Sequence, residues 1–287
     1  MAKKAQYRKF TRSTGGNIAY FSILILFGLV TVFPLFYCII TSLKPLEELL
    51  IFPPKFYVVR PTLDNFKVLP ALLSNLEVPL SRYVFNSVFI AVVTTIGSII
   101  AGSMAAFTFS KSKIKGGKFV FNLITTMMLY NATTLAVPQY LIFSKLGMID
   151  TYWVYILPAI PSTVNCFLMK QFMDEAVNDT LLEAARIDGA GVWRMYWNIV
   201  MPIMKPAIMT VLLFSFQAMW SIVPVGTVFS EEFKTLPYVM SSIAMGGIAR
   251  SGSAMAVTVV LMLPPIFVFL ITQSNVLETM GNSGIKG

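Results

Sequence analysis

Histidine is absent from this chain of 287 residues, and cysteine occurs only twice. Without histidine there is no His-based acid–base catalysis, no Ser–His nucleophile and no access to the commonest metal ligand. Cys38 and Cys166 lie in separate apolar runs, whereas a disulfide framework or a thiolate metal site needs more cysteines at closer spacing. The sequence therefore predicts no enzyme, no metal site and two buried, unreactive thiols.

Charge is also scarce: Asp, Glu, Lys and Arg make up 12% of the residues, whereas 56% are hydrophobic. About a quarter of the residues carry charge in ordinary soluble domains, and half that share cannot cover the surface of a water-soluble body. We therefore expect the lipid bilayer to be the solvent. Soluble enzymes, nucleic-acid-binding proteins and disordered tails are disfavoured as classes.

Charged residues divide the chain into six long windows without Asp, Glu, Lys or Arg. A helix needs about 20 mostly apolar residues to cross the hydrocarbon layer, so each window predicts one crossing. The expected fold is all-α, a polytopic membrane protein with six transmembrane helices. The windows are residues 13–43, 83–110, 119–144, 151–169, 206–230 and 251–277. The short uncharged stretch 235–249 contains Pro237 and predicts a loop with a helix lying against the membrane.

Basic residues predict the orientation of these spans. Residues 1–12 are basic, as in a secretory signal, but no small-x-small cleavage pattern follows the apolar run, so we expect the first span to be retained. Six crossings place both termini on one side, which carries fourteen of the 22 Lys and Arg residues, with the densest internal cluster at Lys111, Lys113, Lys115 and Lys118. Positive loops stay in the cytoplasm, so both termini are expected there. The net charge of +9 then follows from topology and needs no nucleic-acid partner.

This topology gives the expected division of the chain. It consists of a cytoplasmic segment (1–16), a first transmembrane helix (17–43), an external proline-rich loop (44–81), a core of five spans (82–275) and a cytoplasmic tail (276–287).

The cytoplasmic loop 170–202 carries the strongest pattern in the chain. Thr180 followed by Glu183 has capping-box spacing and predicts a helix start, and Gly189 suits the left-handed residue that ends a helix. Leu181, Ala184, Ala185 and Asp188 lie on one side of this helix. A short helix with small side chains fits a groove of another protein, and the alternative is an amphipathic helix resting on the inner leaflet.

A longer pattern extends from this helix. It consists of Glu183-Ala184-Ala185, Gly189 after three further residues, Ile199 after nine more, and Met201-Pro202. The pattern resembles the EAA loop of ABC importer permeases, which usually have Leu where Met201 stands. The resemblance extends over about residues 80–275 and is strongest to carbohydrate permeases, in particular the second permease subunit of maltose-type importers. The ending Ser283-Gly-Ile-Lys-Gly287 is similar to the permeases for aldouronates and alginate.

The resemblance implies a type I ABC importer permease fold in a bacterial inner membrane. It implies that a second permease completes the channel and that an external binding protein delivers a carbohydrate, with an oligosaccharide as the expected cargo. It also implies docking to a cytoplasmic ATPase dimer that binds ATP and Mg²⁺, since this sequence has no Gly-x-x-x-x-Gly-Lys-Ser/Thr motif of its own. The residues implied in docking are Glu183, Ala184, Ala185, Asp188 and Gly189.

Two alternatives stay open. The same architecture imports another solute, or the chain is a non-conducting scaffold or sensor subunit that contacts an ATPase. A proton- or sodium-coupled carrier is disfavoured, because the predicted spans contain no ionisable Asp, Glu, Lys or Arg.

Polar and aromatic residues within the spans are candidates for a sugar path. Phe214, Gln217, Trp220 and Ser221 recur at helical spacings of three and four in the fifth span. Amides, hydroxyls and aromatic rings suit the hydroxyls and the apolar face of a sugar, whereas the alternative makes Trp220 an interface anchor and Gln217 an interhelical donor. Weaker candidates, with structural hydrogen bonding as the alternative, are Asn131, Gln139 and Asn165.

Two further patterns have plain interpretations. Small residues recur every fourth position in the second span, as at Gly97 and Ala101, and predict close helix packing against either this chain or a partner. Residues 229–252 form the last external loop, which either contacts a binding protein or is a solvated connector.

Overall fold

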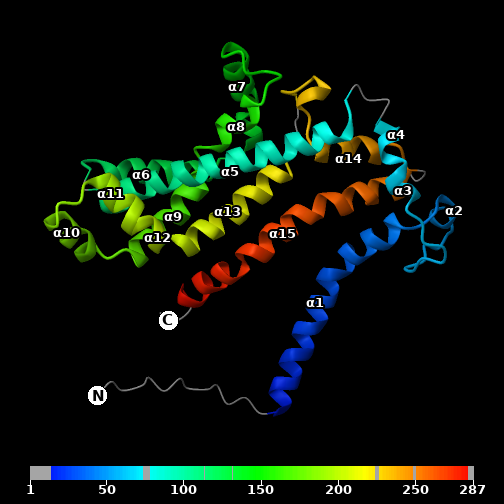
Figure 1. Cartoon of the computed structure of the whole chain (residues 1–287), viewed down its shortest axis with the longest axis horizontal. Helices are drawn as coiled ribbons and strands as arrows, with labels where there is room; N and C mark the ends of the chain where they lie inside the picture. The colour runs from blue at the N-terminus through cyan, green and yellow to red at the C-terminus, as the bar shows by residue number, and fades with distance from the viewer. Residues whose placement is uncertain are drawn as a thin grey trace.

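The computed structural model describes residues 14–73, 78–112, 114–130, 132–223, 226–247 and 250–283. Within these ranges the chain is built of helices and contains no strand, as expected of an all-α protein. Figure 1 shows α5, α13 and α15 running lengthwise, α1 running obliquely beside them, and α7 and α8 projecting from the middle of the molecule. The three long helices are α1 (Thr14–Ser42), α5 (Leu80–Lys111) and α15 (Ser251–Ser283).

These three helices confirm the first, second and sixth predicted windows as helical. Among the described residues, three helices are long and apolar enough to cross a membrane: Gly15–Ser42, Leu80–Lys111 and Ser251–Ser274. A fourth span is obtained if residues 192–203 and 205–220, which meet at 78°, form one bent crossing. The count of six spans therefore stays a prediction.

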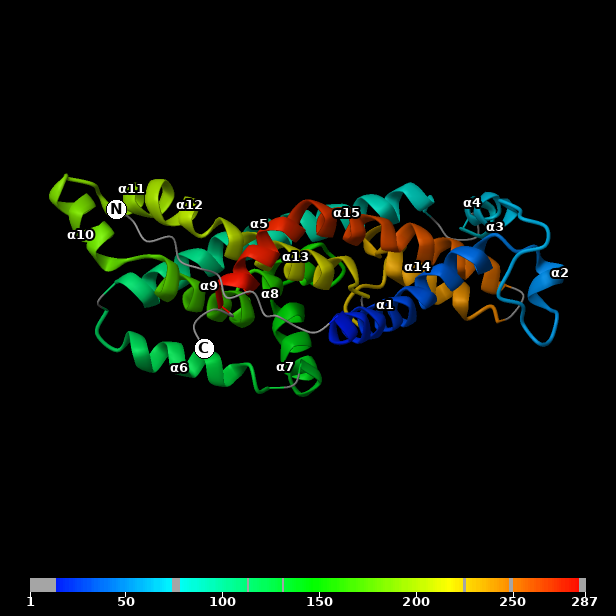
Figure 2. The same ribbon diagram turned by 90° about the horizontal axis from the view of Figure 1, so that it is seen from below.

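The other three windows are interrupted, which corrects the expectation of one continuous helix each. The third window divides into two helices that run in clearly different directions in Figure 2. The fourth divides at residues 160–162, where Pro161 lacks the N–H needed to continue the helix. The fifth helix ends at Trp220, ten residues before its window does. The helices concerned are α6 (Gly117–Met127), α7 (Ala132–Lys145), α8 (Trp153–Ala159), α9 (Thr163–Ala176) and α13 (Lys205–Trp220).

The predicted external loop 44–81 is compact within its described residues. Asn65 Nδ2 donates to the carbonyl oxygens of Ser42 (2.8 Å) and Lys44 (2.7 Å), at the end of α1. The Glu48 carboxylate accepts the N–H groups of Val59 (3.1 Å) and Arg60 (2.8 Å). The loop contains the short helices α2 (Leu46–Leu49), α3 (Asp64–Lys67) and α4 (Leu69–Leu73).

The stretch 235–249 contains a helix, α14 (Leu236–Ala244), as predicted. Pro237 lies in its first turn, where a missing N–H costs nothing. Leu236, Val239 and Ile243 are buried against α5, α13 and α15, so this face of α14 packs on protein and not on lipid.

Helix α5 is the helix against which α8, α9, α13 and α14 pack. Its C-terminal half joins α9 and α13 in one apolar cluster, its N-terminal half joins α14 and α15 in a second, and a third lies against α7 and α8. The small residues predicted to mark a close contact do so within this chain, because a Cβ at Gly97 would lie 3.0 Å from Ile160 and one at Gly102 would lie 3.3 Å from Asn165. In contrast, α1 is exposed along most of its length and packs mainly on α15, near its own C-terminal end in Figure 1.

Candidate functional site

The motif-bearing helix α10 (Asp179–Ile187) begins two residues earlier than its capping-box spacing predicts. Asn178 is the N-cap, and its Oδ1 accepts the N–H of Thr180 at 3.1 Å. Thr180 therefore lies inside the first turn and does not cap it. Both residue types are good caps. Asn178 is the cap in the structure, and it follows the end of α9 by only two residues.

The end of α10 agrees with the prediction made from Gly189. Gly189 has φ +80°, the left-handed conformation that glycine adopts without steric cost. Its N–H donates to the carbonyl of Arg186 (3.0 Å), and the N–H of Ala190 donates to that of Ala185 (2.9 Å). These two bonds form a complete Schellman motif, which satisfies the last carbonyls and turns the chain sharply.

One side of α10 packs against the rest of the chain, and the other side is exposed. Leu182 is buried in the apolar cluster of α5, α9 and α13, where Ala185 and Ala190 are partly buried. The opposite side exposes the remaining docking candidates, Glu183, Ala184, Asp188 and Gly189. Ile187, which the motif did not single out, is 87% exposed and adds an apolar side chain to this surface.

The start of α10 is tied to the end of α5 by Lys111. Its side chain is only 6% exposed, and its Nζ donates to the Val177 carbonyl (2.7 Å) and to Asp179 Oδ1 (2.8 Å). The sequence indicated Lys111 only as a topological charge. Its partners lie 66 and 68 residues away, so local spacing could not reveal them.

The chain beyond Gly189 forms a second surface helix. It consists of α11 (Val192–Met195), a π-helical turn η1 (Tyr196–Val200) and α12 (Met201–Ile203). Met195, Tyr196 and Val200 are buried. Trp193 and Trp197, one turn apart, are exposed by 62% and 47%.

Three of the four residues predicted to line a sugar path lie on one exposed face of α13. Phe214, Gln217 and Ser221 are exposed together, whereas Trp220 is buried with 3% exposure. The reason is geometric: three-residue steps turn a helix by about 300°, so two such steps place Trp220 about 120° from Phe214. Trp220 stacks on Phe216 with ring centroids 5.8 Å apart.

The Trp220 indole has a partner inside the chain. Its Nε1–H donates to the carbonyl of Leu261 at 2.7 Å. That carbonyl would normally accept the N–H of residue 265, but Pro265 has none. The indole therefore satisfies a carbonyl that the proline leaves without its helical partner.

The weaker candidates lie apart from that face. Asn165 is buried, and its Nδ2 donates to Ser215 Oγ at 2.8 Å, linking α9 to α13. Gln139 lies on a mostly apolar cavity of about 700 Å³ between α7, α8 and the end of α13, beside Tyr140 and Phe143. Asn131 lies outside the described residues.

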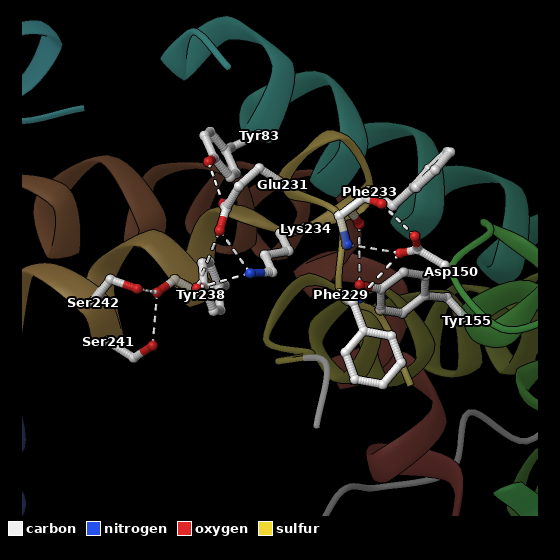
Figure 3. A network of polar contacts seen from close by, with 11 residues as sticks. Tyr83, Asp150, Tyr155, Phe229, Glu231, Phe233, Lys234, Tyr238, Ser241 and Ser242 are labelled. Atoms are coloured by element: carbon white, nitrogen blue, oxygen red, sulfur yellow. Dashed lines mark hydrogen bonds and ion pairs between the residues drawn. The ribbon is translucent and has the colours of Figure 1, made fainter. Parts of the chain in front are cut away.

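The predicted external loop after α13 is bound to the helices by a polar network, shown in Figure 3. Glu231 accepts bonds from Tyr83 (2.6 Å) on α5 and from Lys234 (2.6 Å), and Lys234 also donates to Tyr238 (2.9 Å) on α14. Burial alone would raise the pKa of Glu231, but bonds from Lys234 and Tyr83 outweigh it and lower that pKa. Burial would lower the pKa of Lys234, and its bonds to Glu231 and Tyr238 raise it.

Asp150 anchors the start of the same segment. Its Oδ1 accepts the N–H groups of Phe229 (3.0 Å) and Ser230 (2.9 Å), and its Oδ2 accepts the Ser230 hydroxyl (Figure 3). Burial would raise the pKa of Asp150, but these bonds from residues 229 and 230 lower it. Residues 229–236 are thus tethered to the helices, and contact of the loop 229–252 with a binding protein stays a prediction. We call residues 229–236 the outer segment.

A helical membrane body that presents one short, exposed helix with an EAA pattern is characteristic of the permease subunits of ABC importers. The comparison with protein families agrees, because the model of the binding-protein-dependent transport system inner membrane component matches residues 98–280. The chain belongs to this family. It is therefore a transport subunit in a membrane and not an enzyme.

Individual relatives include permeases that are named for carbohydrate transport systems. Protein LplC of Bacillus subtilis is 32% identical over 202 residues, which cover 68% of this chain and 63% of LplC. The polygalacturonan/rhamnogalacturonan transport system permease protein YtcP of the same organism is 26% identical over 284 residues, covering 93% of this chain and 96% of YtcP. A solved structure of a bacterial ABC transporter involved in alginate import aligns over 93% of this chain and 99% of its own, with a TM-score of 0.77 and 21% identity. The fold is thus that of a type I importer permease.

Proposed function

We propose that the chain is the permease subunit of an ATP-driven importer for a carbohydrate, an oligosaccharide or polysaccharide fragment, and forms half of its translocation pathway. The carrying observation is α10: a short helix held on one side by Leu182, ended by a Schellman motif at Gly189, and exposing Glu183 and Ala184. This arrangement offers a small, well-defined surface that another protein can cover.

The partners follow from that surface and from the family. A cytoplasmic ATPase dimer binds ATP and Mg²⁺ and covers α10. A second permease subunit completes the channel, and an extracytoplasmic solute-binding protein delivers the cargo. The termini lie in the cytoplasm, because the basic loops do.

The carbohydrate cargo is supported by the relatives, of which YtcP is named for polygalacturonan and rhamnogalacturonan. Within this chain, Gln217, Phe214 and Ser221 form an exposed amide, ring and hydroxyl on one face of α13. We propose that this face contacts the sugar, while Trp220 and Asn165 support it from within through their bonds to Leu261 and Ser215.

The test of the coupling surface is Gly189→Val in a reconstituted complex with its binding protein. A β-branched residue at φ +80° is strained whatever the space around it, so the turn after α10 is displaced. Uptake of the sugar should fall to background while insertion of the chain continues. The matched control is Gly191→Val, because Gly191 has φ −69°, an angle open to any residue.

The same assay separates the alternatives. If vesicles that lack this chain still import the sugar at the full rate, the chain is a scaffold. Uptake of a different solute in place of any carbohydrate contradicts the cargo but not the coupling surface. Normal uptake by Gly189→Val contradicts the role of α10.

A further inference from the structure

Helix α5 reaches from α10 to the outer segment and is hydrogen-bonded to both. Its 32 unbroken residues correspond to about 48 Å, whereas the hydrocarbon layer is about 30 Å thick. Both ends therefore project beyond the apolar layer. Figure 1 shows α10 beyond one end of α5 and α14 beside the other.

At the inner end, the ammonium group of Lys111 bridges two elements. It binds the carbonyl of Val177 just after α9 and the carboxylate of Asp179 in the first turn of α10. Ser110 donates to Asp174 on α9, so two consecutive residues of α5 hold the α9–α10 junction. The Lys111 side chain is nearly buried, and charge-assisted bonds in such surroundings are stronger than exposed ones.

At the outer end, consecutive turns of α5 hold the outer segment. Asn86 is fully buried, and its Nδ2 donates to the carbonyls of Glu232 and Lys234, both at 2.8 Å. Ser87 Oγ accepts the N–H of Leu236 at 2.8 Å. One more turn toward the N-terminus, Tyr83 donates to Glu231 (Figure 3).

We infer that Lys111 is a positioning residue through which movement of α10 is transmitted to α5, and through α5 to the outer segment. The inference rests on the proposed function, in which an ATPase covers α10. Displacement of α10 pulls on Asp179 and hence on Lys111. Because α5 is one continuous helix packed on α9, α13 and α14, its outer end then moves together with the segment that Asn86 and Ser87 hold.

Lys111 is distinguished from the lysines that follow it. Lys115 and Lys118 are exposed, whereas among the described residues Lys111 alone joins α5 to α10 by a salt bridge. Lys115→Met is therefore a matched control for Lys111→Met. The Lys111→Arg variant keeps the charge and the capacity to donate to both acceptors.

The experiment uses the complete transporter in proteoliposomes and measures sugar imported per ATP hydrolysed. Lys111→Met should lower this ratio at least fivefold, the lower limit of a typical coupling between sites, and Lys111→Arg should restore most of it. Lys115→Met should leave the ratio unchanged. An unchanged ratio in Lys111→Met overturns the inference.

A second readout follows the outer end directly. With Cys38 and Cys166 replaced by alanine, a cysteine at exposed Ser81 reports the outer end of α5 by its rate of maleimide labelling. ATP should change this rate in the otherwise unaltered complex and not in Lys111→Met, although both label without ATP. An equal ATP effect in both overturns the inference.

Failure of assembly does not leave the question open. If Lys111→Met fails to assemble, the Asp179→Asn variant tests the inference instead. Asp179 is 76% exposed, so its replacement should not disturb the fold. It should lower the sugar-to-ATP ratio in the same direction, and an unchanged ratio contradicts the inference. If the unaltered complex neither binds an ATPase nor transports, the proposed function itself fails and the inference fails with it.

Discussion

The burial of Trp220 is explained by Pro265, which lies 45 positions later in the chain. Prolines 264 and 265 remove two N–H donors from the middle of α15, and the Trp220 indole binds the carbonyl that Pro265 leaves without its helical partner. The aromatic residue that spacing assigned to a sugar path thus has a second explanation in the packing of α13 on α15.

Trp220→Phe should destabilise the purified complex without changing uptake per complex. Phenylalanine keeps the stacking on Phe216 but leaves the part-buried Leu261 carbonyl without a donor, which costs up to about 1–3 kcal/mol. Thermal unfolding in detergent measures the effect. Trp153→Phe is the control, since Trp153 is 58% exposed, and an equal loss of stability in both variants contradicts the role of this bond.

Gln217→Ala should lower uptake per complex without lowering the stability of the complex. Loss of one hydrogen bond to a neutral hydroxyl costs about 1 kcal/mol, so uptake per assembled complex should fall about fivefold while assembly is unchanged. Asn165→Ala serves for comparison, because its amide binds Ser215 and its loss should reduce assembly and not uptake per complex. Normal uptake by Gln217→Ala places the sugar contacts elsewhere, and the partner permease is then the next place to examine.

At the scale of elements, the sequence predicts where a helix ends better than it predicts whether a helix is continuous. Gly189 identified the end of α10, because only a residue free of Cβ strain adopts φ +80° easily. The start was wrong by two residues, since Asn178 and Thr180 are both competent caps. The interrupted third, fourth and fifth windows were missed because a count of uncharged residues measures polarity and not helix continuity. Pro161 was visible in the sequence, but its effect depends on the direction that α9 takes.

The outer segment contains one 3₁₀ turn (Glu231–Phe233) before α14 begins at Leu236, and no local pattern predicted its tethering. Tyr83 and Glu231 are 148 residues apart, and Asp150 and Ser230 are 80 apart. Such contacts are determined by the packing of whole helices. The sequence therefore predicts an external loop here, but it could not predict that this loop is bound to α5, α8 and α14.

The outer segment should weaken at both extremes of pH. Asp150 and Glu231 have pKa values below their ordinary 3.8 and 4.5, so their stabilisation is present above those values and is lost as acid protonates them. The pKa of Lys234 is above 10.5, so its contribution is complete below that pH and is lost in stronger alkali. The melting temperature of the complex should fall below about pH 4, and Glu231→Gln should reduce this acid dependence. The neighbouring, exposed Glu232→Gln should retain it.

At the scale of the whole molecule, orientation depends on the positive-inside rule. With native Cys38 and Cys166 replaced, a cysteine at Lys55 should react with an impermeant maleimide added outside intact cells, and one at Lys115 should react only after permeabilisation. Both lysines are exposed, so a difference in labelling reports sidedness and not burial. Lys113, in the same cluster, lies outside the described residues. Labelling of Lys115→Cys from outside contradicts the orientation.

The long reach of the contacts made by α5 has a consequence for how the protein is synthesised. The buried Tyr83, Asn86 and Ser87 leave the ribosome well before the residues 231–236 that bind them. At about 5–20 residues per second, the delay is roughly 7 to 30 seconds. During that time the nascent second span enters the bilayer with polar side chains whose final partners do not yet exist. Because this end of α5 projects beyond the apolar layer, water and lipid headgroups must satisfy these side chains until α14 has been translated.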